Sequence, residues 1–203
     1  MLLNRVNPFG EIIRTEARGA WMGNRGLLHN DAQEIVRPFK LKAWIICKLE
    51  FKGRRRPVMS PGQYTELFFL DEATAFAAGH RPCFECRRDD ATSFKLCWIK
   101  GNPDYGFNAK TLIGAIDDVL HRERFGDDAR KTVLKKLPAD VPDGTFVTAD
   151  GVPCLLSGGS LYVWSPSGYR ELHDEADVKE FTLLTPESVV NAFRAGYSPQ
   201  TAL

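Results

Sequence analysis

The chain has 203 residues, of which 43% are hydrophobic and 26% charged, and its formal net charge is +1. This length and apolar fraction suit one folded domain with a sizeable core, or two small ones. No run approaches the roughly 18 apolar residues that span a bilayer, and the start lacks a secretory signal pattern. We therefore expect a cytoplasmic protein with no membrane partner, and five cysteines in that reducing compartment indicate free thiols and a metal site.

The charges are distributed unevenly along the chain. Residues 1–60 carry 12 Lys and Arg against 5 Asp and Glu, a net +7, whereas residues 138–203 carry 3 against 9, a net −6. A basic front attracts polyanions such as nucleic acids, and an acidic back offers a surface to a protein partner. The alternative is that the two ends complement each other inside one fold.

The first half of the chain predicts a small hairpin followed by a helix. Residues 41–51 are rich in apolar and β-favouring side chains and predict a buried strand, and residues 67–70 predict a second, short one. Asp71 is a suitable N-cap for a helix over 72–78, and Gly79 a suitable left-handed stop. The stretch GHRPCFECRR, residues 79–88, then follows the end of this helix.

The second half predicts helices and then a run of hairpins. Apolar residues at helical spacing predict a capped helix over 108–126, and a second helix over 127–137 stops at Pro138. Short alternating runs separated by Asp-Gly, Gly-Gly and Ser-Pro-Ser-Gly predict an antiparallel meander over 142–172. A strand over 180–184 precedes a last helix, with Thr185 as N-cap, Pro186 at its first position and Gly196 at its end.

Together these elements predict an α+β fold. A zinc-binding hairpin-and-helix module would occupy residues 1–100, a helical connector 101–137, and a meander with a C-terminal helix 138–203. The three parts could equally form one compact unit.

Cys83 and Cys86 stand three apart on the turn after the first predicted helix. A redox pair would follow a strand and open a helix, which is not the order predicted here. Cysteines buried only for packing have no need of this spacing or of the arginines around it. Two thiolates on a tight turn reach one zinc ion at about 2.3 Å each, so we expect them to bind Zn²⁺.

The stretch ELFFLDEATAFAAGHRPCFECRR, residues 66–88, resembles the segment of Ada-type DNA alkylation-repair proteins that carries their second pair of zinc cysteines. The specific positions are Gly79, Arg81, Pro82, Cys83 and Cys86. The resemblance implies that both cysteines are zinc ligands in a module that binds DNA and passes a methyl group to a zinc-bound cysteine. The family's first pair is Cys-x-x-x-Cys, whereas this chain has one cysteine in the corresponding hairpin.

Two further zinc ligands must come from elsewhere in the chain. Cys47, on the strand before the hairpin loop, is the first candidate, although core packing explains it equally well. His29, in a turn rich in glycine and asparagine, is the second, with a plain surface histidine as the alternative. We expect His80 to pack over the sulfur atoms, and Cys97 and Cys154 to lie in the core.

An arginine-rich face beside the zinc module is the predicted nucleic-acid surface. Guanidinium groups pair with phosphate oxygens, and a tryptophan, Trp21 or Trp44, can stack on a base. A solvated loop, or arginines paired with the acidic end, would explain the same charges. The nucleic-acid-binding residues that we predict are Lys52, Arg54, Arg55, Arg56, Arg25 and Arg81, with Arg18, Arg87 and Arg88 as extensions.

The function that these features favour is zinc-dependent binding of nucleic acid, DNA rather than RNA, in repair or processing. One alternative is a zinc enzyme that acts on nucleic acid or a nucleotide, with Cys47 as a nucleophile if a thiolate reacts. Asp117 and His121, with Glu123 nearby, could form an acid–base pair, but a solvated helix face explains them as well. Another alternative is an interaction module with structural zinc. No catalytic residue is assigned.

Overall fold

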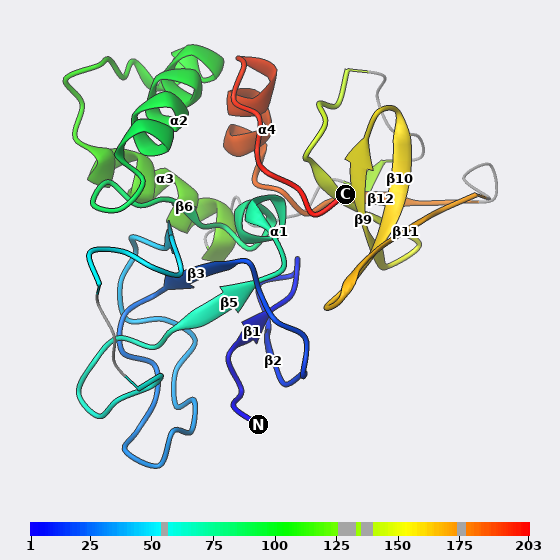
Figure 1. The fold of residues 1–203 in the computed structure, drawn as a ribbon. Coiled ribbons are helices and arrows are strands. Elements are labelled where there is room, and N and C mark those ends of the chain that lie inside the picture. The colour runs from blue at the N-terminus through cyan, green and yellow to red at the C-terminus, as the bar shows by residue number, and fades with distance from the viewer. Residues whose placement is uncertain (54–56, 126–132, 135–139, 174–177) are drawn as a thin grey trace.

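The computed structural model describes residues 1–53, 57–125, 140–173 and 178–203, and the backbone of residues 133–134. Over these residues the fold is α+β, as the sequence predicts, with four helices, two six-stranded sheets and a helix near the C-terminus (Figure 1). The helices of the described part are too short or too polar to traverse a lipid bilayer.

The first sheet has the order β2-β1-β5-β3-β4-β6. β1 pairs with β5 and β4 with β6 in parallel, and the other neighbours are antiparallel. The predicted strands over 41–51 and 67–70 exist, but the first shrinks to three residues. The strands are β1 (Arg5–Val6), β2 (Ile12–Ile13), β3 (Trp21–Asn24), β4 (Ile45–Cys47), β5 (Leu67–Phe69) and β6 (Arg81–Pro82).

The first predicted helix is confirmed as α1 (Glu72–Ala77). The backbone N–H of Thr74 donates to the Asp71 carboxylate at 2.8 Å, which satisfies one of the free donors of the first turn. Gly79 follows the helix at φ +81°. A Cβ there would overlap the side chain of Arg124, so both the backbone conformation and the close approach favour glycine.

Two helices follow, and the sequence prediction missed one of them. α2 (Arg88–Gly101) was not predicted, although its buried residues Ala91, Phe94 and Trp98 have helical spacing. α3 (Ile113–Phe125) starts later than residue 108, because the Asn108 side chain accepts from the Lys110 N–H in a turn.

The helix predicted over 127–137 falls mostly outside the described residues. The two positions that are described, Val133–Leu134, form β7, so the prediction is wrong there.

The predicted antiparallel meander is confirmed. The second sheet has the order β11-β10-β9-β8-β12-β7, and all its neighbours are antiparallel. Gly151 and Gly159 take positive φ in the turns on either side of β9. The remaining strands are β8 (Phe146–Ala149), β9 (Val152–Ser157), β10 (Ser160–Ser165), β11 (Gly168–Glu171) and β12 (Phe181–Leu183).

The last predicted helix is present as α4 (Glu187–Arg194), but its N-terminus is built differently. The Thr185 hydroxyl accepts from the Phe146 N–H at 2.8 Å and so does not cap the helix. Instead the Glu123 carboxylate of α3 accepts from the Ser188 N–H at 2.9 Å and from its hydroxyl at 2.7 Å. A negative charge from another helix thus satisfies the first turn of α4.

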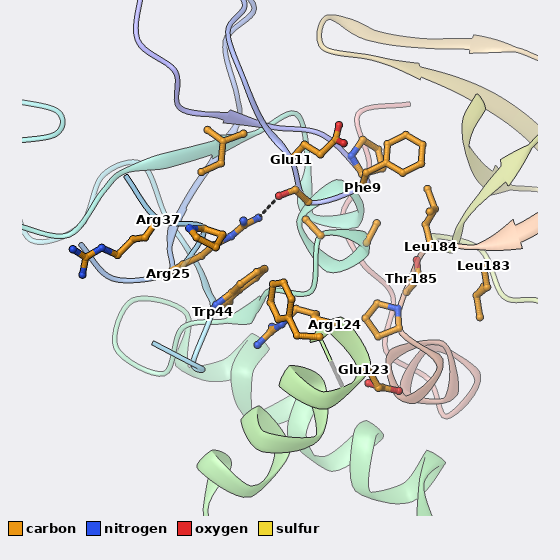
Figure 2. A pocket seen from close by; sticks show the side chains of 18 of the residues that line it. Phe9, Glu11, Arg25, Arg37, Trp44, Glu123, Arg124, Leu183, Leu184 and Thr185 are labelled. Atoms are coloured by element: carbon orange, nitrogen blue, oxygen red, sulfur yellow. Dashed lines mark hydrogen bonds between the residues drawn. The ribbon is translucent and has the colours of Figure 1, made fainter. Parts of the chain in front are cut away.

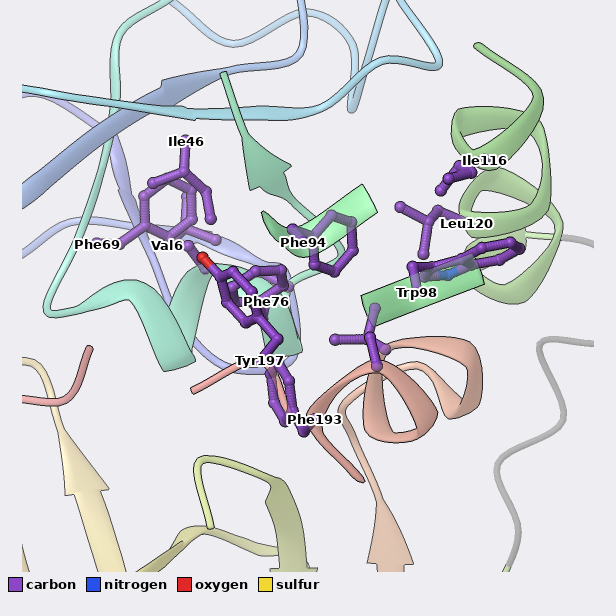
Figure 3. Close-up of a cluster of buried hydrophobic side chains, with 14 of the residues drawn as sticks. Val6, Ile46, Phe69, Phe76, Phe94, Trp98, Ile116, Leu120, Phe193 and Tyr197 are labelled. Atoms are coloured by element: carbon purple, nitrogen blue, oxygen red, sulfur yellow. The ribbon is translucent and has the colours of Figure 1, made fainter. Parts of the chain in front are cut away.

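The largest apolar cluster joins the two ends of the chain. Figure 3 shows Ile46 and Phe69 of the first sheet near Phe76 of α1, with Trp98 of α2 and Phe193 of α4 in the same cluster. Two smaller clusters lie against the second sheet. α4 therefore completes the core of the first sheet, while the boundaries predicted near residues 100 and 137 stay a prediction.

Candidate metal centre

Strand pairing brings Cys47 beside the turn that holds Cys83 and Cys86. β4 ends at Cys47, and its neighbour β6 runs parallel to it with Ile46 opposite Pro82. The Cys83 N–H donates to the Ile46 carbonyl at 2.9 Å, so the chain leaves β6 next to the end of β4. The Cys-x-x-Cys turn then closes with the Arg87 N–H donating to the Cys83 carbonyl, also at 2.9 Å.

The three sulfur atoms form a compact cluster. The Sγ atoms of Cys47, Cys83 and Cys86 all lie within 4.8 Å of one another, and the residues are 8%, 7% and 9% exposed. Thiolates at about 2.3 Å from one tetrahedral zinc ion would lie about 3.8 Å apart. The three sulfur atoms are therefore close enough to hold a metal ion. Cys47, the first candidate for a third ligand in the sequence, lies beside Cys83 and Cys86.

Hydrogen bonds to sulfur prepare the cluster for a cation. The Glu85 N–H donates to the Cys83 sulfur at 3.3 Å, and the Cys47 thiol lowers the pKa of Cys83 to about 5 by donating to it. The same hydrogen bond, together with burial, raises the pKa of Cys47, and burial raises that of Cys86. The hydrogen bonds thus favour the thiolate of Cys83, and a bound metal ion would displace the remaining thiol protons.

A fourth ligand does not come from the other cysteines or histidines. All five cysteines and all four histidines of the chain are among the described residues, and only three of these nine side chains meet in one cluster. Apolar side chains pack against the sulfur atoms instead, namely those of Met22, Ile45 and Phe51. A metal ion at this site would take its fourth ligand from a carboxylate, from solvent or from a bound molecule.

His29 does not lie at the cluster, contrary to the sequence prediction. Its Nδ1 is 2.6 Å from the Thr65 hydroxyl, and its Nε2 is 3.2 Å from the Ser60 carbonyl. The ring is 4% exposed and links two loops of the N-terminal half. The sequence around His29 indicates a turn, but it does not show that the ring forms hydrogen bonds with Ser60 and Thr65 more than 30 residues later.

The other candidates take structural positions. His80 does not pack over the sulfur atoms but lies between the rings of Trp44 and Phe69, with centroid distances of 5.1 and 4.7 Å. Cys154 is fully buried on β9 of the second sheet, and Cys97 packs against the largest cluster, as expected.

Two predicted nucleic-acid-binding arginines are buried and therefore cannot contact phosphate on the surface. Arg81 is 5% exposed and forms a bidentate pair with Asp117, with N–O distances of 2.8 and 2.7 Å. Arg25 is 2% exposed. The sequence could not distinguish them from surface arginines, because their partners are distant along the chain.

Arg87, proposed as an extension of the face, is buried as well. It forms an ion pair with Glu72 at 2.7 Å and lies 4.1 Å from the centroid of the Trp21 ring. Lys52 is exposed, as predicted for a contact residue, while Arg54, Arg55 and Arg56 fall outside the described residues. Lys48, Lys52 and Arg88, which lie within five residues of a cluster cysteine in the sequence, are exposed.

The acid–base pair considered on α3 is not assembled. Asp117 is committed to Arg81, and Glu123 to the first turn of α4. His121 packs against Phe39 and Phe125 with centroid distances of 5.0 and 5.4 Å. These residues hold the fold together and do not face a common site.

Comparison of the chain with models of known protein families, with curated proteins and with solved structures finds no match. The resemblance of residues 66–88 to Ada-type repair proteins therefore stays a prediction, and the three-cysteine cluster does not by itself identify that module.

Proposed function

We propose that this protein binds Zn²⁺ through Cys47, Cys83 and Cys86 and binds nucleic acid with the surface next to that ion. The observation that carries the proposal is the convergence of three thiols within 4.8 Å, from two segments 36 residues apart in the sequence. Sulfur ligands favour Zn²⁺ over hard cations such as Mg²⁺ and Ca²⁺. The lowered pKa of Cys83 supports metal binding, because the hydrogen bonds that lower it favour the thiolate, which is the form that binds a metal ion.

Metal content tests the zinc half of the proposal. The purified wild-type protein should contain about one zinc ion per chain, and Cys47→Ser, Cys83→Ser and Cys86→Ser should each lose most of it. Cys97→Ser is the matched control, since that thiol lies on α2 away from the cluster, and His29→Ala should also keep the metal. Wild-type protein purified under reducing conditions without metal would contradict the proposal.

The nucleic-acid half is supported by the exposed cations around the centre. Lys48 directly follows Cys47, and Arg88 follows Cys86 by two residues. Lys52 lies two residues before the arginine-rich stretch 54–56. Phosphate contacts made by such side chains require no sequence recognition and weaken with salt.

Fluorescence anisotropy with labelled single-stranded and duplex DNA, and with RNA of the same sequence, tests this half. Affinity should fall steeply between low and physiological salt, and a triple Arg54→Ala, Arg55→Ala, Arg56→Ala variant should bind more weakly. The control is Arg122→Ala, Arg170→Ala, Lys179→Ala, which removes three exposed cations elsewhere. A zinc-loaded protein that binds none of these probes at low salt would overturn nucleic-acid binding and leave the zinc proposal intact.

The missing fourth cysteine or histidine favours a second candidate, a zinc enzyme. A catalytic zinc ion keeps three protein ligands and one exchangeable position, whereas a structural ion is closed by four. Co²⁺ substituted for zinc reports this directly. Its visible spectrum should change on addition of cyanide if the position is open, and an unchanged spectrum would favour the structural role.

A further inference from the structure

A large pocket lies at the other end of β4 from the cysteine cluster. Its volume is about 990 Å³, within the range of small-molecule sites. Figure 2 shows Trp44 and Arg25 on one side of it and Phe9 and Leu184 on another, so the first sheet and the segment before α4 both contribute. Its apolar lining includes Ile12 and Phe125.

Two guanidinium groups flank the indole ring of Trp44 in this pocket. The Cζ atoms of Arg25 and Arg124 each lie 3.9 Å from the ring centroid, and Figure 2 shows them on opposite sides of the ring. Both faces of Trp44 are therefore covered, so it offers no stacking surface to a base. The indole instead holds two like charges close together, and their mutual repulsion has an electrostatic cost.

Arg25 differs from the other buried arginines in having no carboxylate partner. Arg81 pairs with Asp117 and Arg87 with Glu72, whereas Arg25 forms no ion pair with any described residue. Its Nε donates to Nε2 of His80 at 3.3 Å and its Nη2 to the Gly10 carbonyl at 2.9 Å, while Nη1 makes no hydrogen bond to a described residue. A buried charge without a counterion is costly.

Arg124, on the other face of the ring, is partly buried and lies near the carboxylates of Asp117 and Glu123. It donates to the carbonyls of Gly79 and Lys42, and its buried Nε has no hydrogen-bond partner among the described atoms. Burial and the neighbouring Arg124 lower the pKa of Arg25 to about 9, and burial lowers that of Arg124 to about 10. Both groups therefore remain charged at neutral pH.

The carboxylates that line the pocket are exposed or already used. Glu11 is exposed and accepts from the Asn7 amide at 2.8 Å. Glu123 is held by the first turn of α4, and Glu187 is exposed at the rim. The described part of the chain thus places the buried Arg25 guanidinium in this pocket without an ion-paired carboxylate, and the partly buried Arg124 lies beside it.

We propose that this pocket binds a small organic oxyanion, a carboxylate or phosphate on an apolar body, whose charge Arg25 and Arg124 neutralise. Nη1 of Arg25 donates to the oxyanion, and the apolar walls, which include Ile12 and Phe125, hold the body of the ligand. The proposal is independent of the zinc centre, because its residues and its ligand are different.

Isothermal titration calorimetry with 1-naphthyl phosphate, 1-naphthoate and neutral 1-naphthol tests the proposal. One or both anions should bind with a Kd of about 1 mM or tighter, and naphthol about tenfold more weakly, because only the anions are drawn to the guanidinium groups. The two anions distinguish phosphate from carboxylate. Inorganic phosphate should bind more weakly than naphthyl phosphate, because it lacks the apolar body.

Arg25→Met and Arg124→Gln should each weaken anion binding by about tenfold. The control is Arg122→Gln, which removes an exposed cation of the same helix outside the pocket and should bind as the wild type does. Should Arg25→Met fail to fold, Arg124→Gln decides. Equal binding of naphthol and the anions, equal affinities of Arg124→Gln and Arg122→Gln, or no binding of either anion by the wild type would each overturn the proposal.

Discussion

The two sheets of this protein are built on different principles. The strands of the first sheet have two to four residues, and buried charges and thiols lie among them. Two inner strands of the second sheet, β9 and β10, have six residues each, are joined by a glycine turn and contribute side chains to two apolar clusters. The cysteine cluster and the pocket arginines both lie around the short strands of the first sheet. A long regular strand buries and exposes its side chains in alternation, whereas loops and strand ends can direct several side chains to one point.

Metal removal should produce the largest difference in stability between the two sheets. If zinc joins β4 to the turn after β6, chelation should cost the N-terminal half several kcal/mol, because zinc contributes about 10 kcal/mol or more to small zinc modules. Hydrogen exchange should then show lost protection in β4 and residues 81–88 and retained protection in β8, β9 and β10. Identical exchange with and without chelator would mean that the cluster does not need a metal for its stability.

Breaking a buried ion pair of the first half should have the next largest effect. Asp117→Asn leaves the Arg81 guanidinium buried beside a neutral group, which should cost about 3–5 kcal/mol in urea unfolding. Asp118→Asn is the matched control, because that exposed carboxylate pairs with Lys42 on the surface and its removal should have little effect. Similar losses for the two variants would show that the buried pair does not stabilise this region.

Acid should weaken the first half through His80. The ring is fully buried beside the cations Arg25 and Arg124, and burial is the main reason why its pKa lies well below the usual value. The folded protein therefore keeps His80 neutral, whereas the unfolded chain takes up the proton as the pH falls through about 6.5. Stability due to this group is present above that pH and is lost below it, by about 1.4 kcal/mol per pH unit.

Urea unfolding between pH 7 and pH 4.5 measures this loss. His80→Gln should reduce the slope of stability against pH by about one proton, even if it lowers stability at every pH. His173→Gln, at an exposed position of the acidic half, should leave the slope unchanged. An unaltered slope in His80→Gln would contradict the assignment.

Two glycine substitutions, one in each half of the chain, should differ least in the stability that they cost. Gly79→Ala combines a φ of +81° with a contact to Arg124 and should cost about 2 kcal/mol. Gly158→Ala, in the turn between β9 and β10, meets no atom within 4 Å and should cost about 1 kcal/mol for its positive φ alone. Thermal unfolding of both variants would test this order.

Elements with a local signal were predictable from the residues themselves. Asp71 and Gly79 mark the two ends of α1, and the glycine turns between alternating runs mark the meander, because caps and turns depend on side chains a few residues apart. Cys47 could be proposed as a ligand together with Cys83 and Cys86, because the residues around it predict the strand that precedes the hairpin loop. The sequence did not predict α2, because only three of its 14 residues are buried and its apolar pattern is correspondingly weak.

Other features depended on partners far apart in the sequence. Composition shows that Arg25, Arg81 and Arg87 are positive. Only the fold shows that Arg81 and Arg87 form ion pairs with carboxylates, whereas Arg25 faces a pocket and forms no ion pair with a described residue. Likewise only the fold places His29 beside Thr65, away from the thiols. Short-range patterns encode backbone geometry, whereas the partner of a buried charge is chosen by tertiary packing, because the cost of burial can be offset by any group that the fold brings within reach.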